Sequence, residues 1–256
     1  VISLSAALLV ARALARRQAF VGRWLLLRCF SVALVVPSII AVFGIVLLHG
    51  KYGYFNQLWT WLGGDPQSYV YGLKGILLAH VFFNLPLVTR ILLQRFDAIN
   101  PETWRLSSQL GMTSMDLWRH IEWPHIKGAL PQLGALVFAL CFTSFAIVMT
   151  LGGGPKATTI EVAIFQAIRF DFDLAKAVYL SLLQMFFCGF ILWVGLRLGK
   201  PIDVFVSLEV SVKNMRSDRK SLLGIIADTL VLLLATLLVL LPSVSYTHLT
   251  LPTILL

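Results

Sequence analysis

The chain has 256 residues, of which 58% are hydrophobic and only 13% are charged. Soluble globular domains carry about 25% charged residues, so an ordinary water-soluble fold is excluded. Disorder is excluded too, because disordered chains combine low hydrophobicity with high net charge. The apolar residues come in runs of about 20, the length at which a helix crosses a bilayer core of roughly 30 Å. The composition therefore predicts an all-α, polytopic membrane protein, since open sheets cannot satisfy their backbone in lipid.

The formal net charge is +9, from 21 Lys and Arg against 12 Asp and Glu. The basic residues lie in particular loops between apolar runs, which is the pattern that orients membrane proteins, so no nucleic-acid partner is expected. The three cysteines lie inside apolar runs without metal-ligand spacing, so no disulfide, metal or cofactor is expected. They are Cys29, Cys141 and Cys188.

Six spans are predicted in chain order. They lie near residues 1–15, 29–48, 72–93, 129–151, 174–196 and 222–241. Lys and Arg alternate along the five loops between them as rich, poor, rich, poor, rich. The first, third and fifth loops are therefore predicted to be cytoplasmic, with the start of the chain outside.

Both ends of the chain are unusual. The first span opens without an initiator methionine, so we expect it to be truncated. The last residues read SVSYTHLTLPTILL from Ser243 and continue neither a helix pattern nor a charged outer loop. They resemble the translated read-through of a sequencing adapter, so residues 244–256 are expected to be non-native.

His80 and Asn84 lie one turn apart within the third span, followed by Pro86, which is expected to bend the helix. Polar groups at this depth either join helices by hydrogen bonds or face a translocation path. Both readings stay open for these residues. A proton-coupled carrier would need more buried acids than the spans contain.

The third loop, residues 94–128, is long for a connection between spans. Asn100, Pro101 and Glu102 predict a helix start, and that helix is expected to run toward Leu110 and stop at a hinge on Gly111. A second short helix is predicted over 114–121. Apolar surface that lies outside the lipid is expected to dock on something. It is supplied by Trp104, Leu106, Leu110, Leu117 and Ile121.

The stretch RLSSQLGMTSMDLWRHIEWP, residues 105–124, resembles the cytoplasmic EAA loop of ABC importer permeases. Gly111, Ile121 and Pro124 match the spacing of that loop, while Arg105-Leu106-Ser107 replaces Glu-Ala-Ala and Trp123 replaces Leu. The resemblance implies that the loop couples the spans to an ATPase. The residues implied are Glu102, Arg105, Leu106, Ser107, Leu110, Gly111, Ile121 and Pro124.

AHVFFNLPLVTR, residues 79–90, and the stretch 150–177 resemble the thiamine importer permeases of Gram-negative bacteria more closely. The resemblance implies a type I ABC importer permease fold in the bacterial inner membrane. It also implies two copies of a cytoplasmic ABC ATPase and a periplasmic substrate-binding protein as partners, with thiamine or its phosphate esters as substrate. Residues 1–200 would then form a first lobe, 201–221 a cytoplasmic linker and 222–243 the first span of a second lobe.

Other functions stay open beside this one. Ferric iron permeases share the two-lobe plan, and an ATP-independent carrier or an intramembrane enzyme would belong to other classes. A carrier usually shows inverted repeats with broken helices, and an enzyme needs paired catalytic groups, neither of which the sequence presents. Three acids in the fourth loop either meet the binding protein or a cationic substrate, or are simply solvated. They are Glu161, Asp171 and Asp173.

Overall fold

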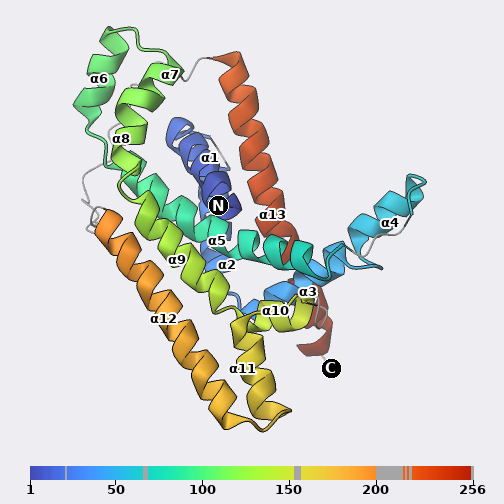
Figure 1. The fold of residues 1–256 in the computed structure, drawn as a ribbon. Helices are drawn as coiled ribbons and strands as arrows, with labels where there is room; N and C mark the ends of the chain where they lie inside the picture. Colours follow the sequence, from blue (N-terminus) through green and yellow to red (C-terminus); the bar gives the residue numbers. More distant parts are fainter. Residues whose placement is uncertain are drawn as a thin grey trace.

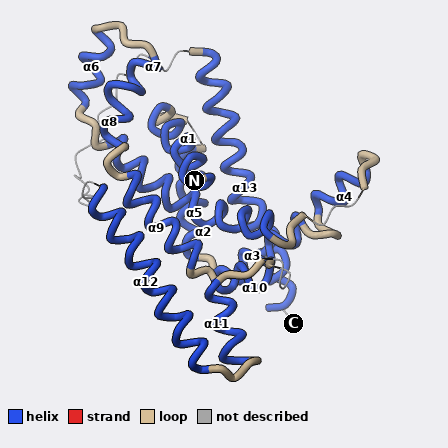
Figure 2. The backbone as a smooth tube through the Cα atoms, in the orientation of Figure 1, coloured by secondary structure: helices blue, strands red, loops and turns tan. Residues whose placement is uncertain are grey.

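The computed structural model describes residues 1–20, 22–65, 69–152, 157–199, 216, 218 and 221–254, without the side chains of 223 and 246–254. Every regular element in this part of the chain is a helix (Figures 1 and 2). The predicted linker, residues 201–221, lies almost wholly outside the described residues. The all-α class predicted from composition is confirmed.

Two helices form the centre of the bundle, α1 (Ile2–Arg16) and α5 (Leu73–Asp97), which pack closely on each other. The face of α1 that meets the bundle carries Ala7, Ala11 and Leu14, all 0% exposed. Small side chains let helix backbones approach closely, and this is the main way helices associate in lipid. Helix α5 is the most buried of the candidate membrane spans in the described chain, with 61% of its most apolar window inside the protein.

Helices α2 (Arg23–Val35) and α3 (Ser38–His49) occupy the second predicted span. Pro37 separates them, because proline lacks the N–H that an uninterrupted helix would use there. The short helix α4 (Tyr54–Trp61) follows and projects from the bundle (Figure 1). Its Tyr54 and Trp61 are exposed, as expected of rings at a membrane interface.

The predicted span 129–151 is also broken. Helix α9 (Leu130–Phe142) ends at Thr143, and α10 (Phe145–Leu151) begins after Ser144. A further helix, α11 (Ile160–Arg169), follows and packs on α12 (Leu174–Leu198).

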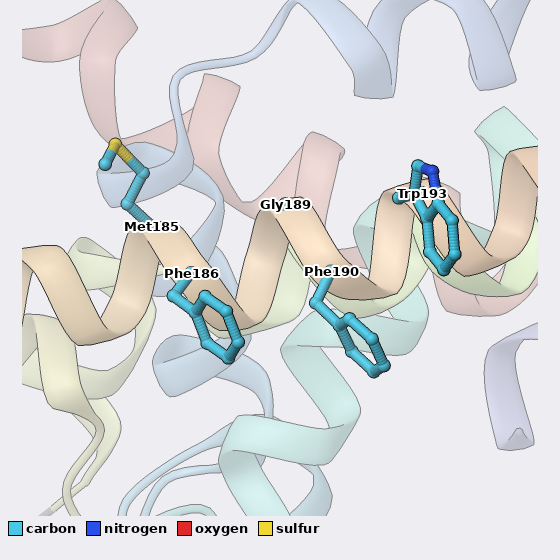
Figure 3. Close-up of a pocket in the computed structure, with 5 residues that line it drawn as sticks. All are labelled: Met185, Phe186, Gly189, Phe190 and Trp193. Atoms are coloured by element: carbon cyan, nitrogen blue, oxygen red, sulfur yellow. The ribbon is translucent and has the colours of Figure 1, made fainter.

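Helix α12 presents most of its surface outward, with only 11% of its most apolar window buried. Figure 3 shows the rings of Phe186, Phe190 and Trp193 pointing to the same side of this helix, where they line an open apolar pocket. These side chains are half or more exposed, at 65%, 51% and 54%. Such a surface is stable only against lipid or another apolar surface.

The final helix, α13 (Leu222–Ile254), packs on α1 and α3. It continues through Pro242 beyond residue 241, so the expectation that the helix pattern stops there is wrong. The residues of this stretch include no glycine that would end the helix. Whether residues 244–256 are native stays a prediction.

By length and composition, four helices of the described chain are able to cross a membrane, or five if a bent pair counts as one span. Each of the six predicted spans coincides with helix, but six is a loose count. Helix α1 has 15 residues, and two of the predicted runs are interrupted.

Candidate functional site

The third loop contains the helix α6 (Pro101–Gln109), which begins and ends as predicted. The Glu102 backbone N–H donates to Asn100 Oδ1 at 2.9 Å, and Pro101 occupies the first turn. Glu102 adds a negative charge at the positive end of the helix. The start of this helix is therefore encoded locally.

Gly111 follows α6 with φ +63°, in the left-handed region that favours glycine. Helix α7 (Ser114–Leu117) then starts with a capping box between Thr113 and Asp116. Hydrogen bonds from the Thr113 side chain and backbone hold the pKa of Asp116 below its ordinary value. Two helices hinged on a glycine are thus present, as predicted.

The second helix does not end at residue 121, and that expectation is wrong. The chain continues as the π-helical turn η1 (Trp118–Glu122) and then as α8 (Trp123–Ile126). In this turn the Trp123 N–H bonds the Trp118 carbonyl, five residues back. A 62° bend then separates Ser114–Ile126 from Leu130–Phe142. π-helical turns are frequent at functional sites.

The structure divides the predicted docking surface of the loop in two. Leu106 and Leu110 are 59% and 76% exposed on one side of α6. Glu102, Arg105, Gly111 and Pro124 are exposed as well. In contrast, Trp104, Leu117 and Ile121 are buried within the protein, and so is Ser107, whose hydroxyl donates to the Trp104 carbonyl at 2.9 Å.

The buried residues therefore support the loop from inside, because Trp104, Leu117 and Ile121 dock on the protein's own bundle. Tertiary packing on the bundle covers them, which their apolar character alone does not reveal. Met115, 72% exposed, is an apolar side chain of the same region that the sequence reading missed.

Beneath α6 and α7 lies a group of buried and partly buried charges that sequence reasoning also missed. We call it the Glu122 cluster. Four arginines and three acids from four parts of the chain interact in it. The members are Arg12, Arg16, Arg17, Glu122, Arg216, Asp218 and Asp228.

Within the cluster, burial alone would raise the pKa of Asp218. The hydrogen bond and charge of Arg216, together with the charges of Arg16 and Arg12, outweigh burial, so the pKa lies below its ordinary value. For Arg216, burial lowers the pKa, but Asp218 and Glu122 outweigh it and the pKa rises. Both groups are therefore ionised at neutral pH.

His80 and Asn84 take part in contacts between helices. His80 Nε2 lies 2.7 Å from Ser144 Oγ, at the break between α9 and α10. The Asn84 amide donates to the His80 carbonyl and to Cys141 Sγ, at 2.9 and 3.3 Å. Pro86 is buried in the same helix. These contacts favour the interhelical reading, and a place on the translocation path stays a prediction.

Of the three acids of the fourth loop, Asp171 and Asp173 lie in the turn between α11 and α12, and Glu161 lies in the first turn of α11. Asp171 pairs with Lys176 at 3.0 Å, with both side chains about half exposed. Asp173 accepts from the Lys176 backbone N–H at 2.9 Å as the cap of α12, and Glu161 accepts from Gln184. Contacts within the protein thus use part of the hydrogen-bonding capacity of all three acids, while Asp171 and Asp173 stay exposed.

The chain is similar to thiamine transport system permease proteins. It is 44% identical over 245 residues to the protein of Salmonella typhimurium and 45% identical over 244 residues to that of Escherichia coli. These matches cover 96% and 95% of the chain but 45% of each relative, so the chain spans less than half of their length. A ferric transport system permease protein of Actinobacillus pleuropneumoniae is 26% identical over 228 residues.

Among solved structures, a chain of a bacterial alginate ABC transporter in complex with an alginate-bound periplasmic protein matches with a TM-score of 0.62 and 16% identity. The match covers 78% of this chain and 75% of that chain. No family model matches. The predicted permease fold and the resemblance to thiamine importer permeases are both confirmed.

Proposed function

From its place among the thiamine transport permeases, we propose that this chain is the membrane-spanning part of an ATP-driven, binding-protein-dependent importer. Its substrate is thiamine or a phosphate ester of thiamine, carried across the bacterial inner membrane. A periplasmic binding protein delivers the substrate to the outer face. Two copies of a separate ATPase bind the inner face, so this chain is a transport subunit and not itself an enzyme.

The observation that carries the coupling role is the exposed face of α6. Glu102, Arg105, Leu106, Gln109 and Leu110 follow the three- and four-residue spacing that places side chains on one side of a helix. The opposite side carries the buried Trp104 and Ser107. The helix is therefore anchored on one side and offers a mixed apolar and charged surface on the other, which fits a protein partner outside the lipid.

ATP-driven closure of the partner would push this helix, and the bundle would respond by alternating between outward and inward access. Coupling of this kind needs an element with two discrete arrangements that the partner biases. The Gly111 hinge and the 62° bend after Ile126 are the candidates for that element.

Thiamine is favoured over ferric iron because the thiamine relatives are 44% and 45% identical and the ferric relative is 26% identical. The exposed acids Asp171 and Asp173 would attract a cationic substrate or a basic surface of the binding protein. Neutralising Glu161, Asp171 and Asp173 together should reduce docking of the binding protein and uptake. Unchanged docking and uptake would leave these acids as a solvated turn.

The deciding experiment follows uptake of labelled thiamine and of iron in cells that lack both importers. The full-length gene is expressed with its ATPase and binding protein, with and without ATP depletion. We expect thiamine uptake that is lost on depletion. Iron uptake would correct the substrate, and uptake that survives depletion would overturn the ATP-driven mechanism.

The docking surface is tested separately with Leu106→Glu combined with Leu110→Glu. Placing two carboxylates on the apolar part of α6 should abolish copurification of the ATPase. Gln109→Glu on the same exposed face is the control, since it adds a charge without removing apolar surface. Equal copurification of the ATPase with the unsubstituted protein, the double variant and Gln109→Glu would contradict the assignment of α6 as the docking surface.

A further inference from the structure

Glu122 is fully buried, and each of its carboxylate oxygens faces a different arginine. Oε2 accepts from Arg12 Nε at 2.7 Å, and Oε1 accepts from Arg216 Nη2 at 2.6 Å. The side chains of Glu122 and Arg216 are 0% and 1% exposed. A buried carboxylate with two charged donors joins three separate parts of the chain at one point: α1, η1 and the segment before α13.

The two arginines extend this point to both helices of the loop. Arg216 lies over the ring of Trp104 in α6, 4.3 Å from its centroid. Arg12 lies over the ring of Trp118, at 4.7 Å, and donates to the Ser114 carbonyl at 3.1 Å. Cation–π contacts are attractive and strengthen when water is excluded. A movement of α6 would therefore change the contact between Trp104 and Arg216, and a movement of α7 would change the hydrogen bond between Ser114 and Arg12.

The other charges of the Glu122 cluster carry the connection to α13. Asp218 pairs with Arg216 and with Arg16, each at 3.1 Å. Asp228, in the second turn of α13, pairs with Arg16 at 3.1 Å and with Arg17 at 2.9 Å. Ion pairs thus run without interruption from under α6 through the end of α1 to the start of α13. Figure 1 shows these segments at one end of the bundle.

We propose that the Glu122 cluster transmits movement of α6 to α1 and α13, with Glu122 as the positioning residue at its centre. The proposal rests on the coupling function assigned to α6 above. Glu122 lies on the π-helical turn just before the 62° bend, where the loop enters the bundle. Since α13 is expected to open a second lobe, the cluster would make both lobes respond to one coupling helix.

Buried ion pairs suit such a role. Removing one partner leaves the other charge buried and uncompensated, so the members hold one another in a single arrangement. Leu106 and Leu110, on the opposite side of α6, are left free to contact the ATPase. The surface that would receive the force and the cluster that would pass it on are therefore different residues, and they are separable by substitution.

The first test compares Glu122→Gln and Arg216→Gln in the full-length complex with its ATPase and binding protein. Glutamine keeps the size of the glutamate side chain but removes its charge. We expect both variants to insert, to bind the ATPase and to hydrolyse ATP, while thiamine uptake falls by an order of magnitude or more. The double variant should import no less than the single variants, because residues of one network are not additive.

Arg197→Gln is the matched control. Arg197 lies over the ring of Trp193 at 5.5 Å, as Arg216 lies over Trp104, but it is exposed and outside the cluster. Its uptake should equal that of the unsubstituted protein. If Glu122→Gln and Arg216→Gln also import normally, the proposal is overturned while the coupling function stands. If the unsubstituted chain binds no ATPase and imports nothing, both proposals fall.

A second measurement does not depend on how well these variants fold. Spin labels are placed at exposed positions after the three native cysteines are replaced by alanine: Met115 in α7, Leu222 in α13 and Val178 in α12. On ATP binding, the distance from Met115 to Leu222 should change less than the distance from Met115 to Val178. A change in the first distance as large as the second would show that α7 and α13 move independently and would overturn the proposal.

Discussion

Gly111 joins α6 to α7 through a backbone conformation that most residues avoid. A Cβ added there would meet nothing within 4 Å, so the constraint comes from φ of +63° and not from space. Proline fixes φ near −65°, whereas asparagine visits the left-handed region more readily than most residues. Substitutions at Gly111 therefore test the backbone conformation without introducing a steric clash.

This residue gives the first prediction. Gly111→Pro should reduce thiamine uptake by an order of magnitude or more, because it forces the connection between the two helices out of its native geometry. Gly111→Asn should retain most of the uptake. Immunoblots of membranes would establish that both proteins insert. Normal uptake by the proline variant would show that the hinge is not needed for coupling.

Asp218 gives a prediction about pH. Its pKa is lower in the folded protein than the ordinary value of 3.8. A depressed acid pKa stabilises the fold above the unfolded value, and this contribution is lost as pH falls through the folded value. The melting temperature of the detergent-solubilised protein should therefore fall as the pH drops below about 4.

Asp218→Asn should lower the melting temperature at neutral pH and flatten its decline in acid. In the folded protein Asp218 is faced by Arg216, Arg16, Arg12 and the Ser114 hydroxyl. The pKa of Arg216 is raised above its ordinary value by Asp218 and Glu122, so this arginine does not titrate in the acid range where Asp218 does. An identical acid profile for the variant would exclude Asp218 as a source of the pH dependence.

Among the helices, α9 and α12 touch through a glycine. A Cβ built on Gly195 would lie 2.5 Å from Ala135 Cβ and 3.1 Å from the Pro131 carbonyl oxygen, while one on Gly189 would meet nothing within 4 Å. Both glycines lie within α12. Close approach at small residues is a principal source of helix association in lipid.

Gly195→Ala should therefore destabilise the bundle, by about 1–3 kcal/mol, because overpacking forces the two helices apart. Gly189→Ala on the same helix is the control and should leave the melting temperature unchanged or slightly raised. Thermal unfolding in detergent measures both. Equal melting temperatures for the two variants would mean that α9 and α12 do not pack closely in the membrane.

At the scale of the whole molecule, the alternation of basic loops predicts which ends of the helices lie in the cytoplasm. Met115 and Phe170 are 72% and 66% exposed, on α7 and on the turn after α11. With cysteine at these positions, an impermeant maleimide added to intact spheroplasts should label residue 170 and spare residue 115. The unsubstituted chain, with three partly buried cysteines, gives the background. The opposite labelling would invert the topology.

How well the sequence anticipates this fold depends on how local the signal is. The boundaries of α6 follow from Asn100, Pro101 and Gly111, which act within one turn of the helix. The outward exposure of Leu106 and the burial of Trp104 do not follow, because both are apolar residues of the same short helix. Only packing on the bundle distinguishes them.

The Glu122 cluster is harder to predict from the sequence, because its members are far apart along the chain. Glu122 is 94 residues from Arg216 and 110 from Arg12, and Arg16 is 212 residues from Asp228. No periodicity relates positions at such separations. The number of arginines in each loop indicates the orientation of the spans in the membrane, but it does not indicate which acids the arginines pair with. The only local trace is an acid placed beside Trp123 and Pro124 in the loop motif.

These separations along the chain also impose an order in time. Chains are synthesised at about 5–20 residues per second, so Arg216 emerges on the order of 5–20 s after Glu122. Throughout that interval the carboxylate of Glu122 has Arg12, already synthesised, to pair with, and the position of Arg216 over Trp104 is still empty. The residues of the loop helices are thus synthesised before Arg216, Asp218 and Asp228, which complete the cluster. The cluster is therefore complete only after α13 has been synthesised and Asp228 is able to pair with Arg16 and Arg17.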